Sequence, residues 1–355
     1  MTSTMNMPNS TKCISLNKRR FKRRVIIFAA YFSLLAIFFL LGCEIILRLR
    51  GFKPYSPVEL NIKIEPGGKL FCPHPVLGYS HLPGKFKVKL NDGYSFELTH
   101  LTNGLRATRP LSEITTGRPS IWIMGCSFTH GWSLNDNQTF PWLIQAALTN
   151  YDVLNFGVNG YGTVQSLYQF RYFLKSLPKP AVVVATYAYF HDERNTFLRS
   201  WKKAIVPYNK LGTIAPPYAR FDKNGNLAFF SNPASYKEFP LQRYSALVHF
   251  IEQKYNELED RKVKSHQVTK AVMEIFANEC KSNGIEFIVA GITRGNTTAD
   301  LLEFCKMKNI KAVDISVNLS NPENRNLPHD DHPGALAHKQ YAEKLLNYLE
   351  KNVLK

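Results

Sequence analysis

The residues of this chain that could do chemistry stand in loops between regular elements. Ser127 lies in a glycine-flanked loop directly after the apolar run 121–124, and the last loop of the chain holds the run Pro328-His329-Asp330-Asp331-His332. A serine hydroxyl attacks a carbonyl group only if an imidazole takes its proton and an acid orients that imidazole. A serine, a histidine and an aspartate in such loops therefore indicate nucleophilic acyl transfer.

The sequence from residue 119 onward predicts the elements that position these loops. Strands are expected at 121–124, 151–156, 181–187, 286–290 and 311–315, and helices at 141–149, 163–177, 267–282, 298–308 and 333–352. Apolar strands that alternate with helices indicate an α/β fold in which a parallel sheet is covered on both faces, as three layers. Ligands bind such a sheet beyond the carboxyl ends of its strands, where Ser127, Gly160, His191 and the 328–332 loop would meet.

Two regions depart from this alternation. Residues 51–118 are rich in proline and glycine, and alternating runs at 86–90 and 94–98 flank the turn Asn91-Asp92-Gly93. These runs predict a small β-rich module of antiparallel strands. Residues 192–262 carry many aromatic residues and interrupt the helix–strand rhythm, so they predict an insertion beside the sheet within a domain that covers 119–355.

The N-terminus predicts a membrane anchor. Residues 1–24 hold seven Lys and Arg residues and no acid, and Val25–Cys43 is a run without any charge whose apolar character continues to Leu47. A helix of this length spans about 28 Å, close to the ~30 Å hydrocarbon core of a bilayer. We expect a transmembrane helix at 25–47 with the basic tail in the cytoplasm and the rest of the chain outside it. The run Leu40-Leu41-Gly42-Cys43 leaves a lipoprotein cleavage site open as an alternative.

The composition narrows the classes of function. The chain has 355 residues, 45% of them hydrophobic, and a formal charge of +18 whose densest block is the basic tail. No nucleic-acid-binding motif accompanies this charge, so no nucleic acid is expected as a partner. The six cysteines lack zinc-ligand spacing, so neither a metal nor another cofactor is expected. A disulfide between Cys280 and Cys305 stays open.

Three sequence blocks resemble those of the SGNH/GDSL hydrolases, and in particular their membrane-anchored bacterial members. They are Gly125-Cys126-Ser127-Phe128-Thr129-His130-Gly131, Asn155-Phe156-Gly157-Val158-Asn159-Gly160 and Asp330-Asp331-His332-Pro333. Shorter matches upstream are Asn103-Gly104-Leu105-Arg106 and the residues that follow the apolar run, Glu44 to Phe52. The three blocks occur along the chain in the order that the family has. The resemblance implies an SGNH-like, flavodoxin-like α/β domain.

The resemblance also implies the role of each residue. Ser127 would be the nucleophile and His332 the base, and the backbone amides of Ser127 and Gly160 would form the oxyanion hole. The family places its acid two or three residues before the histidine, and three before is His329, so Asp330 fits. An extended loop turns residues i and i+2 to the same side, which also favours Asp330 over Asp331. Asp331 stays open as the alternative.

Two positions depart from the family pattern. Cys126 replaces the aspartate that precedes the serine, and because adjacent residues leaving a strand point to opposite sides, we expect Cys126 and Ser127 not to share a pocket. His191 stands where the family has an oxyanion asparagine. A neutral imidazole N–H can donate in its place, whereas the loss of one such donor costs roughly 100- to 1000-fold in rate. The alternative is a surface histidine beside an Asp192–Arg194 pair.

The sequence thus predicts a serine esterase or O-acyltransferase anchored in a bacterial inner membrane, with its catalytic domain in the periplasm. The expected substrate is an acylated polysaccharide or lipid of the envelope, and the oligomeric state is open. A rival from another class is a catalytically inactive protein of the same fold that binds glycan or scaffolds an envelope complex, because Cys126 and His191 depart from the family blocks.

Overall fold

The computed structural model describes residues 10–57, 62–113, 117–206 and 212–354. It divides into two compact units: the anchor unit, Met1–Val58 with Glu238–Tyr255, and the sheet unit, Glu59–Lys237 with Asn256–Lys355. The basic tail predicted at 1–24 lies partly outside the described residues, since helix α1 begins at Ser10 and side chains are described from Phe21 onward.

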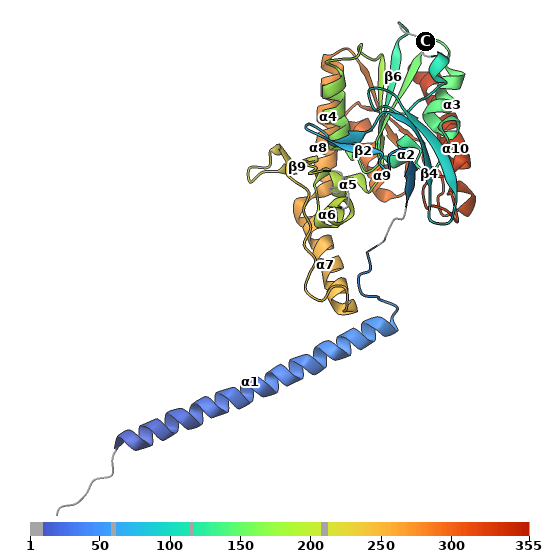
Figure 1. The fold of residues 1–355 in the computed structure, drawn as a ribbon. Coiled ribbons are helices and arrows are strands. Elements are labelled where there is room, and N and C mark those ends of the chain that lie inside the picture. The colour runs from blue at the N-terminus through green and yellow to red at the C-terminus, as the bar shows by residue number, and fades with distance from the viewer. Residues whose placement is uncertain (1–9, 58–61, 114–116, 207–211, 355) are drawn as a thin grey trace, which may run out of the picture. The chain divides into compact units, whose positions relative to one another are not determined.

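The anchor unit is built on the long helix α1, Ser10–Leu49 (Figure 1). Its part Phe21–Leu49 is long and apolar enough to cross a membrane, and none of its most apolar stretch is buried within the protein. The rings of Phe32 and Phe39 along this helix are 64% and 70% exposed. The predicted apolar helix is therefore confirmed. The first part of helix α7, Ala246–Val263, also belongs to this unit, as far as Tyr255.

The sheet unit contains one five-stranded sheet. Its strands are β6 (Ser120–Gly125), β7 (Asp152–Gly157), β8 (Val182–Tyr187), β11 (Glu286–Gly291) and β12 (Lys311–Asp314). They lie in the order β12-β11-β8-β6-β7, and every neighbouring pair is parallel. Counted along the chain this is the flavodoxin-like order 2-1-3-4-5, which places a crevice between the first and third strands. The predicted parallel α/β sheet is confirmed.

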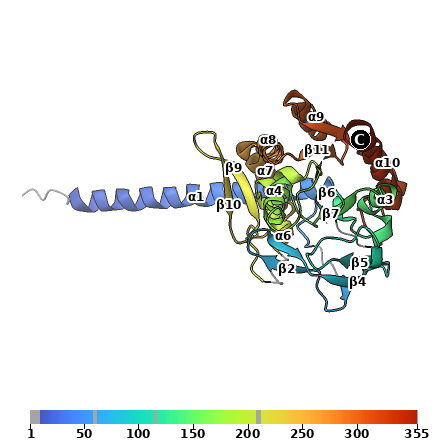
Figure 2. The same ribbon diagram turned by 90° about the horizontal axis from the view of Figure 1, so that it is seen from above.

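Helices cover both faces of the sheet (Figure 2). On one face lie α4 (Thr163–Phe173), α8 (Ser265–Ser282) and α9 (Asn296–Met307), and on the other α3 (Phe140–Ala147) and α10 (Ala335–Asn352). Strand β6 shows why: Ile121 and Ile123 enter one core cluster, and the alternate residues Trp122 and Met124 enter the other. An all-apolar strand is stable only between two covered faces.

The region before β6 forms short antiparallel strands. Strands β1 (Lys63–Glu65), β4 (Gly84–Lys89) and β5 (Ser95–His100) pair in the order β1-β4-β5, and β2 (Phe71–His74) pairs with β3 (Gly78–His81). The two strands predicted from alternating residues are β4 and β5, whereas β1, β2 and β3 were not predicted. Their buried side chains share a core cluster with Trp132, Tyr161 and Trp201.

The stretch 192–262, predicted as an insertion, contains both helices and a β-hairpin. It contains α5 (His191–Asn195), α6 (Arg199–Ile205), and the hairpin of β9 (Pro217–Phe221) and β10 (Leu227–Ser231). The hairpin packs its apolar side chains into the core cluster of α4 and α8, so it covers helices and not the sheet itself. Residues 238–255 belong to the anchor unit instead.

The five cysteines whose side chains the structure describes are free thiols. The possible disulfide between Cys280 and Cys305 is therefore not formed, and both side chains pack in the core cluster of α8 and α9. Burial raises the pKa of the Cys305 thiol to about 12, which keeps it protonated at neutral pH.

Buried histidines give the fold a pH-dependent stability. Burial lowers the pKa of His81 and of His338 to about 3, and the His338 ring accepts a hydrogen bond from the Phe140 amide at 3.0 Å. The unfolded chain binds these protons near pH 6.5, so the free energy of unfolding should fall as the pH drops below that value. Each histidine should contribute about 1.4 kcal/mol per pH unit.

Urea unfolding of the full-length protein in detergent at pH 7, 6 and 5 measures this slope. His338→Gln keeps an acceptor for the Phe140 amide and should flatten the slope by the share of one histidine. An unchanged slope in His338→Gln would contradict the prediction.

Candidate active site

Ser127, the predicted nucleophile, follows a sharp turn from strand β6 into the short helix α2, Ser127–His130. Cys126 caps the helix in an extended conformation, and its carbonyl accepts from the Thr129 and His130 amides. Gly157, at the end of β7, lets this turn lie close to β7, because a Cβ at residue 157 would stand 2.2 Å from the backbone nitrogen of His130. Gly157 thus allows the turn that carries Ser127 to pack against β7 at the carboxyl edge of the sheet.

The structure brings Ser127, His332 and Asp330 into one hydrogen-bonded chain. The Ser127 Oγ lies 3.1 Å from the His332 Nε2, and the His332 Nδ1 is hydrogen-bonded to the Asp330 Oδ1. The same carboxylate oxygen accepts from the His332 backbone amide at 2.7 Å. A hydroxyl, an imidazole and a carboxylate in this order have the geometry of an activated nucleophile. Their catalytic roles remain predictions.

Asp330 is held as a carboxylate by its surroundings. Burial by itself raises its pKa, but hydrogen bonds from the His332 ring and amide and from the Trp132 indole outweigh that effect and lower the pKa below its usual value. The Trp132 Nε1 donates to the second oxygen, Oδ2, at 3.0 Å. Trp132 was not predicted as a site residue, since nothing in the sequence ties it to a residue so far along the chain.

Asp331 does not reach His332. Its side chain is 82% exposed and forms an ion pair with Arg325 at 2.9 Å. The two adjacent aspartates thus face different surroundings, as the alternation of an extended loop predicts. His329 also lies apart, hydrogen-bonded to Asp92 and stacked on Tyr94.

Gly160 occupies a position that only glycine fits. Its φ of +83° is left-handed, and a Cβ would stand 2.5 Å from the Tyr79 hydroxyl. That hydroxyl donates to the Asn159 carbonyl at 2.7 Å and fixes the loop after β7. Within the part of the chain that the structure describes, the backbone amides of Ser127 and Gly160 donate to no group. They are free to bind an oxyanion, which remains their predicted role.

His191 is fully buried, and neither ring nitrogen has a partner among the described residues. Burial, and then the charge of Arg194, lower its pKa well below the usual value, so the imidazole is neutral. The surface alternative is wrong: Asp192 pairs with His266 at 2.8 Å and not with Arg194. No contact between His191 and Ser127 appears in the described structure, so its oxyanion role stays a prediction.

Cys126 is completely buried beside the nucleophile. The side chain that meets His332 is that of Ser127, in accordance with the expectation that the two residues face opposite sides.

Arg106 binds the backbone that directly follows the nucleophile turn. Its buried guanidinium donates to the carbonyls of His130 at 2.8 Å and of Gly131 and Leu134 at 2.6 Å. Its Nε pairs with Asp136 at 3.0 Å, which balances the buried charge. A guanidinium that bonds several carbonyls at once fixes their spacing because its donors form a rigid fork.

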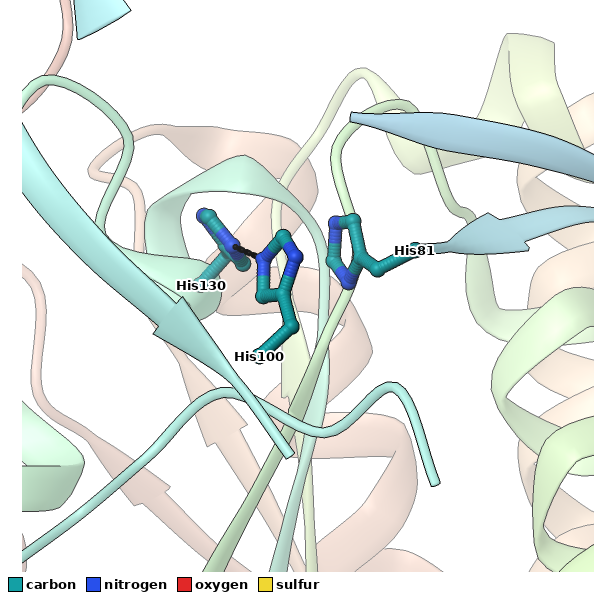
Figure 3. Close-up of side chains that lie close together, drawn as sticks. All are labelled: His81, His100 and His130. Carbon is teal, nitrogen blue, oxygen red and sulfur yellow. Dashed lines mark hydrogen bonds between the residues drawn. The ribbon is translucent and has the colours of Figure 1, made fainter. Parts of the chain in front are cut away.

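Three buried histidines join the antiparallel strands to helix α2 (Figure 3). His81 ends β3, His100 ends β5 and His130 ends α2, and the His100 and His130 Nε2 atoms are 3.0 Å apart. Burial lowers the pKa of each ring, and the charge of Arg106 lowers it further. All three are therefore neutral.

This histidine cluster offers three nitrogen donors within 4.8 Å of one another, a possible metal-ligand set. However, the His81 and His100 rings are stacked, with centroids 4.0 Å apart and planes 16° apart. A metal ion lies in the plane of each imidazole that binds it, so two stacked rings cannot both direct a lone pair at one ion. The nearby charge of Arg106 would also repel a cation. The arrangement fits a neutral packing contact better than a metal site.

A pocket of about 570 Å³ lies next to this site, although neither Ser127 nor His332 lines it. The Phe128 ring in its wall lies with its centroid 5.7 Å from that of the His332 ring. The pocket walls include Phe128 and Asp331, the sequence neighbours of Ser127 and His332, together with the aromatic rings of Tyr189 and Phe190 and the cations Arg294 and Arg325. This volume is typical of small-molecule sites.

No protein-family model matches the chain, and no curated protein matches it. Solved structures similar to it include a member of the lipolytic protein G-D-S-L family from Veillonella parvula, at 11% identity, covering 65% of this chain and 98% of the other, with a TM-score of 0.39. A GDSL-like lipase from Bacteroides thetaiotaomicron has 15% identity, coverage of 70% and 93%, and a TM-score of 0.38. A psychrotrophic esterase from Pseudoalteromonas has 10% identity, coverage of 65% and 97%, and a TM-score of 0.38.

The first two of these proteins carry the name of the family that the sequence blocks around Ser127 and His332 resemble. Any function of this chain depends on the side chains at the carboxyl edge of its sheet.

The two adjacent aspartates allow a matched test of the site. Asp330→Asn should slow the labelling of Ser127 by a fluorophosphonate probe by about 10⁴-fold, because an amide leaves the imidazole in the wrong tautomer. Asp331→Asn should label at the wild-type rate, since its exposed carboxylate contacts Arg325 and not His332. Equal effects of the two changes would contradict this assignment.

Trp132→Phe keeps an aromatic ring but removes the indole N–H. The labelling rate should fall about 10-fold, since a hydrogen bond to a charged group is worth about 1.5–3 kcal/mol. The pKa of Asp330 should rise, so the acid limb of the rate–pH profile should move to higher pH. A lower rate with an unmoved acid limb would show that the indole acts only through packing.

Proposed function

We propose that this protein is a membrane-anchored serine esterase or O-acyltransferase of the SGNH type that acts on ester groups of an envelope component. One observation carries the proposal: Ser127, His332 and Asp330 form a hydrogen-bonded chain at the carboxyl edge of a flavodoxin-like sheet. That edge is where open α/β sheets bind their ligands.

In the first half of the reaction, the Ser127 Oγ attacks the ester carbonyl while the His332 Nε2 accepts the hydroxyl proton. Asp330 stabilises the imidazolium that forms. The amides of Ser127 and Gly160, with His191 as a candidate third donor, stabilise the negative oxygen of the tetrahedral intermediate. The intermediate collapses when the C–O bond to the leaving alcohol breaks and His332 returns the proton to that alcohol. The product is an acyl-serine.

In the second half, a hydroxyl group attacks the acyl-serine and gives its proton to His332. Water as the attacking group gives an esterase, and a sugar hydroxyl gives an O-acyltransferase. The proton then returns to the Ser127 oxygen as the acyl bond breaks, so the enzyme is restored without any metal or other cofactor.

The pocket supports an acylated and anionic substrate. Arg294 is exposed at its wall and forms no ion pair among the described residues, so it is available to an anionic group. The rings of Phe128, Tyr189 and Phe190 supply apolar surface for an acyl chain or a sugar face. Acylated polysaccharide or lipid of the envelope combines both features.

The proposed location follows from the N-terminus. The apolar part of α1, Phe21–Leu49, follows a basic tail, which favours a cytoplasmic N-terminus in a bacterial inner membrane. The sheet unit would then face the periplasm, where envelope polysaccharides and lipids are exposed.

Turnover of p-nitrophenyl acetate by the full-length protein in detergent tests this function. Ser127→Ala and His332→Ala should each lower kcat by at least about 10⁴-fold, because each removes a member of the activated pair. Cys126→Ala should retain activity, since its side chain is buried away from His332.

A folded wild type that is as slow as Ser127→Ala would exclude a general esterase. Probe labelling of Ser127 would then indicate a transferase that lacks its acceptor. Glycan binding that Ser127→Ala leaves intact, with no labelling, would instead support the inactive binding protein.

A further inference from the structure

The C-terminal end of α1 is bonded to the start of α7, within the anchor unit. The Glu44 carboxylate accepts from the Ser245 hydroxyl at 2.7 Å and from the Ala246 and Leu247 amides at 3.0 and 2.8 Å. These amides belong to the first turn of α7, whose N–H groups have no partner within the helix. Glu44 therefore caps α7 with a charge that the helix dipole favours.

Further contacts extend this junction along the chain. The Arg48 side chain bonds to Glu44 at 2.6 Å and donates to the Tyr244 carbonyl at 2.8 Å. The Phe52 ring packs edge-on against Phe250, with ring centroids 5.3 Å apart. The turn before α7 is thus fixed to the last two turns of α1.

The position of Glu44 sets the depth of this turn. It is the first charged residue after the uncharged run Val25–Cys43, so in a helix that crosses a bilayer it marks the edge of the hydrocarbon core. A turn bonded directly to Glu44 and Arg48 lies within a side-chain length of that edge. The headgroup region beyond the edge is roughly 5–8 Å thick on each side, from bilayer dimensions.

The turn presents apolar and aromatic side chains to its surroundings. Leu241 is 66% exposed and Tyr244 is 77% exposed. Leu241 also has a φ of +63°, a left-handed conformation that costs a leucine about 1–2 kcal/mol. The Tyr244 and Ser245 amides both donate to the Leu241 carbonyl at 2.9 Å, so the backbone of the turn is hydrogen-bonded while the leucine side chain stays exposed.

The residues around the turn fit a lipid surface. Tyrosine is enriched at membrane–water interfaces, because its ring is apolar and its hydroxyl polar. Arg50 and Lys53 are exposed and follow the end of α1, where cations can approach lipid phosphates.

We propose that the turn formed by residues 239–245 lies in the headgroup region of the bilayer that α1 crosses, as a second membrane contact beside the helix. Leu241 and Tyr244 insert toward the acyl boundary, and Glu44 and Arg48 lock the turn to α1. This assigns a role to the part of the insertion that the catalytic proposal leaves unused. The inference rests on the proposed membrane span.

The test places a photoreactive p-benzoylphenylalanine at one of three positions in the full-length protein, reconstituted in vesicles of phosphatidylethanolamine and phosphatidylglycerol. The positions are Tyr244 in the turn, Phe32 in α1 as the control for the span, and Met307 in α9, which is 70% exposed, as the background. Mass spectrometry after irradiation counts the lipid adducts at each position.

Lipid adducts at Tyr244 several-fold above those at Met307, together with adducts at Phe32, are the expected result. Adducts at Phe32 with only background or protein adducts at Tyr244 would overturn the proposal and leave the anchor intact. Background at both positions would overturn the membrane span, and the proposal with it. Esterase turnover of the same samples reports separately on the proposed catalytic function.

Discussion

The contact between the Ser127 hydroxyl and the His332 imidazole is the constraint on which the site depends, because it joins loops that follow β6 and β12. Two strands, β8 and β11, separate β6 from β12 in the sheet, so the last loop must reach across their ends. Cross-loop bonds hold it there. Trp132 donates to Asp330, and the Asn326 amide group donates to the Ser133 carbonyl at 3.3 Å. Both anchoring groups directly follow the nucleophile turn, so hydroxyl and imidazole are positioned by one connected set of bonds.

The buried ionisable groups around the nucleophile turn differ in charge. Asp330 stays ionised because several donors satisfy its oxygens, and Arg106 stays buried because Asp136 and three carbonyls satisfy its guanidinium. The histidines around them are neutral, since burial opposes a further charge so close to Arg106. A buried ion without such partners would cost several kcal/mol. The nucleophile turn is thus rigid without a net excess of buried charge.

Features that depend on local sequence pattern could be predicted from the sequence. The apolar runs placed the five parallel strands, and the period of two in an extended loop pointed to Asp330 as the aspartate that meets His332, which the geometry matches. The contacts that long-range packing controls could not be predicted. Trp132 on Asp330, Tyr79 on the loop of Gly160, and Glu44 on α7 each join segments whose distance no spacing encodes. His191 illustrates the same limit, because a polar residue beside Asp192 and Arg194 resembles a surface position, yet it is fully buried.

The two departures from the family blocks bear on whether the site is active. Cys126 replaces an acid at a position that is completely buried and turned away from His332, so the replacement alters what lies behind the nucleophile and not what touches it. His191 replaces an amide with a neutral imidazole, both of whose nitrogens lack partners among the described residues, and its role as an oxyanion donor stays a prediction. Loss of activity through either change would require that the chain from Ser127 to Asp330 be broken or that its oxyanion donors be used elsewhere. Neither condition is met, because that chain is intact and the amides of Ser127 and Gly160 bond to no other described group. These two observations support the proposed acyl-transfer site over the alternative of an inactive binding protein.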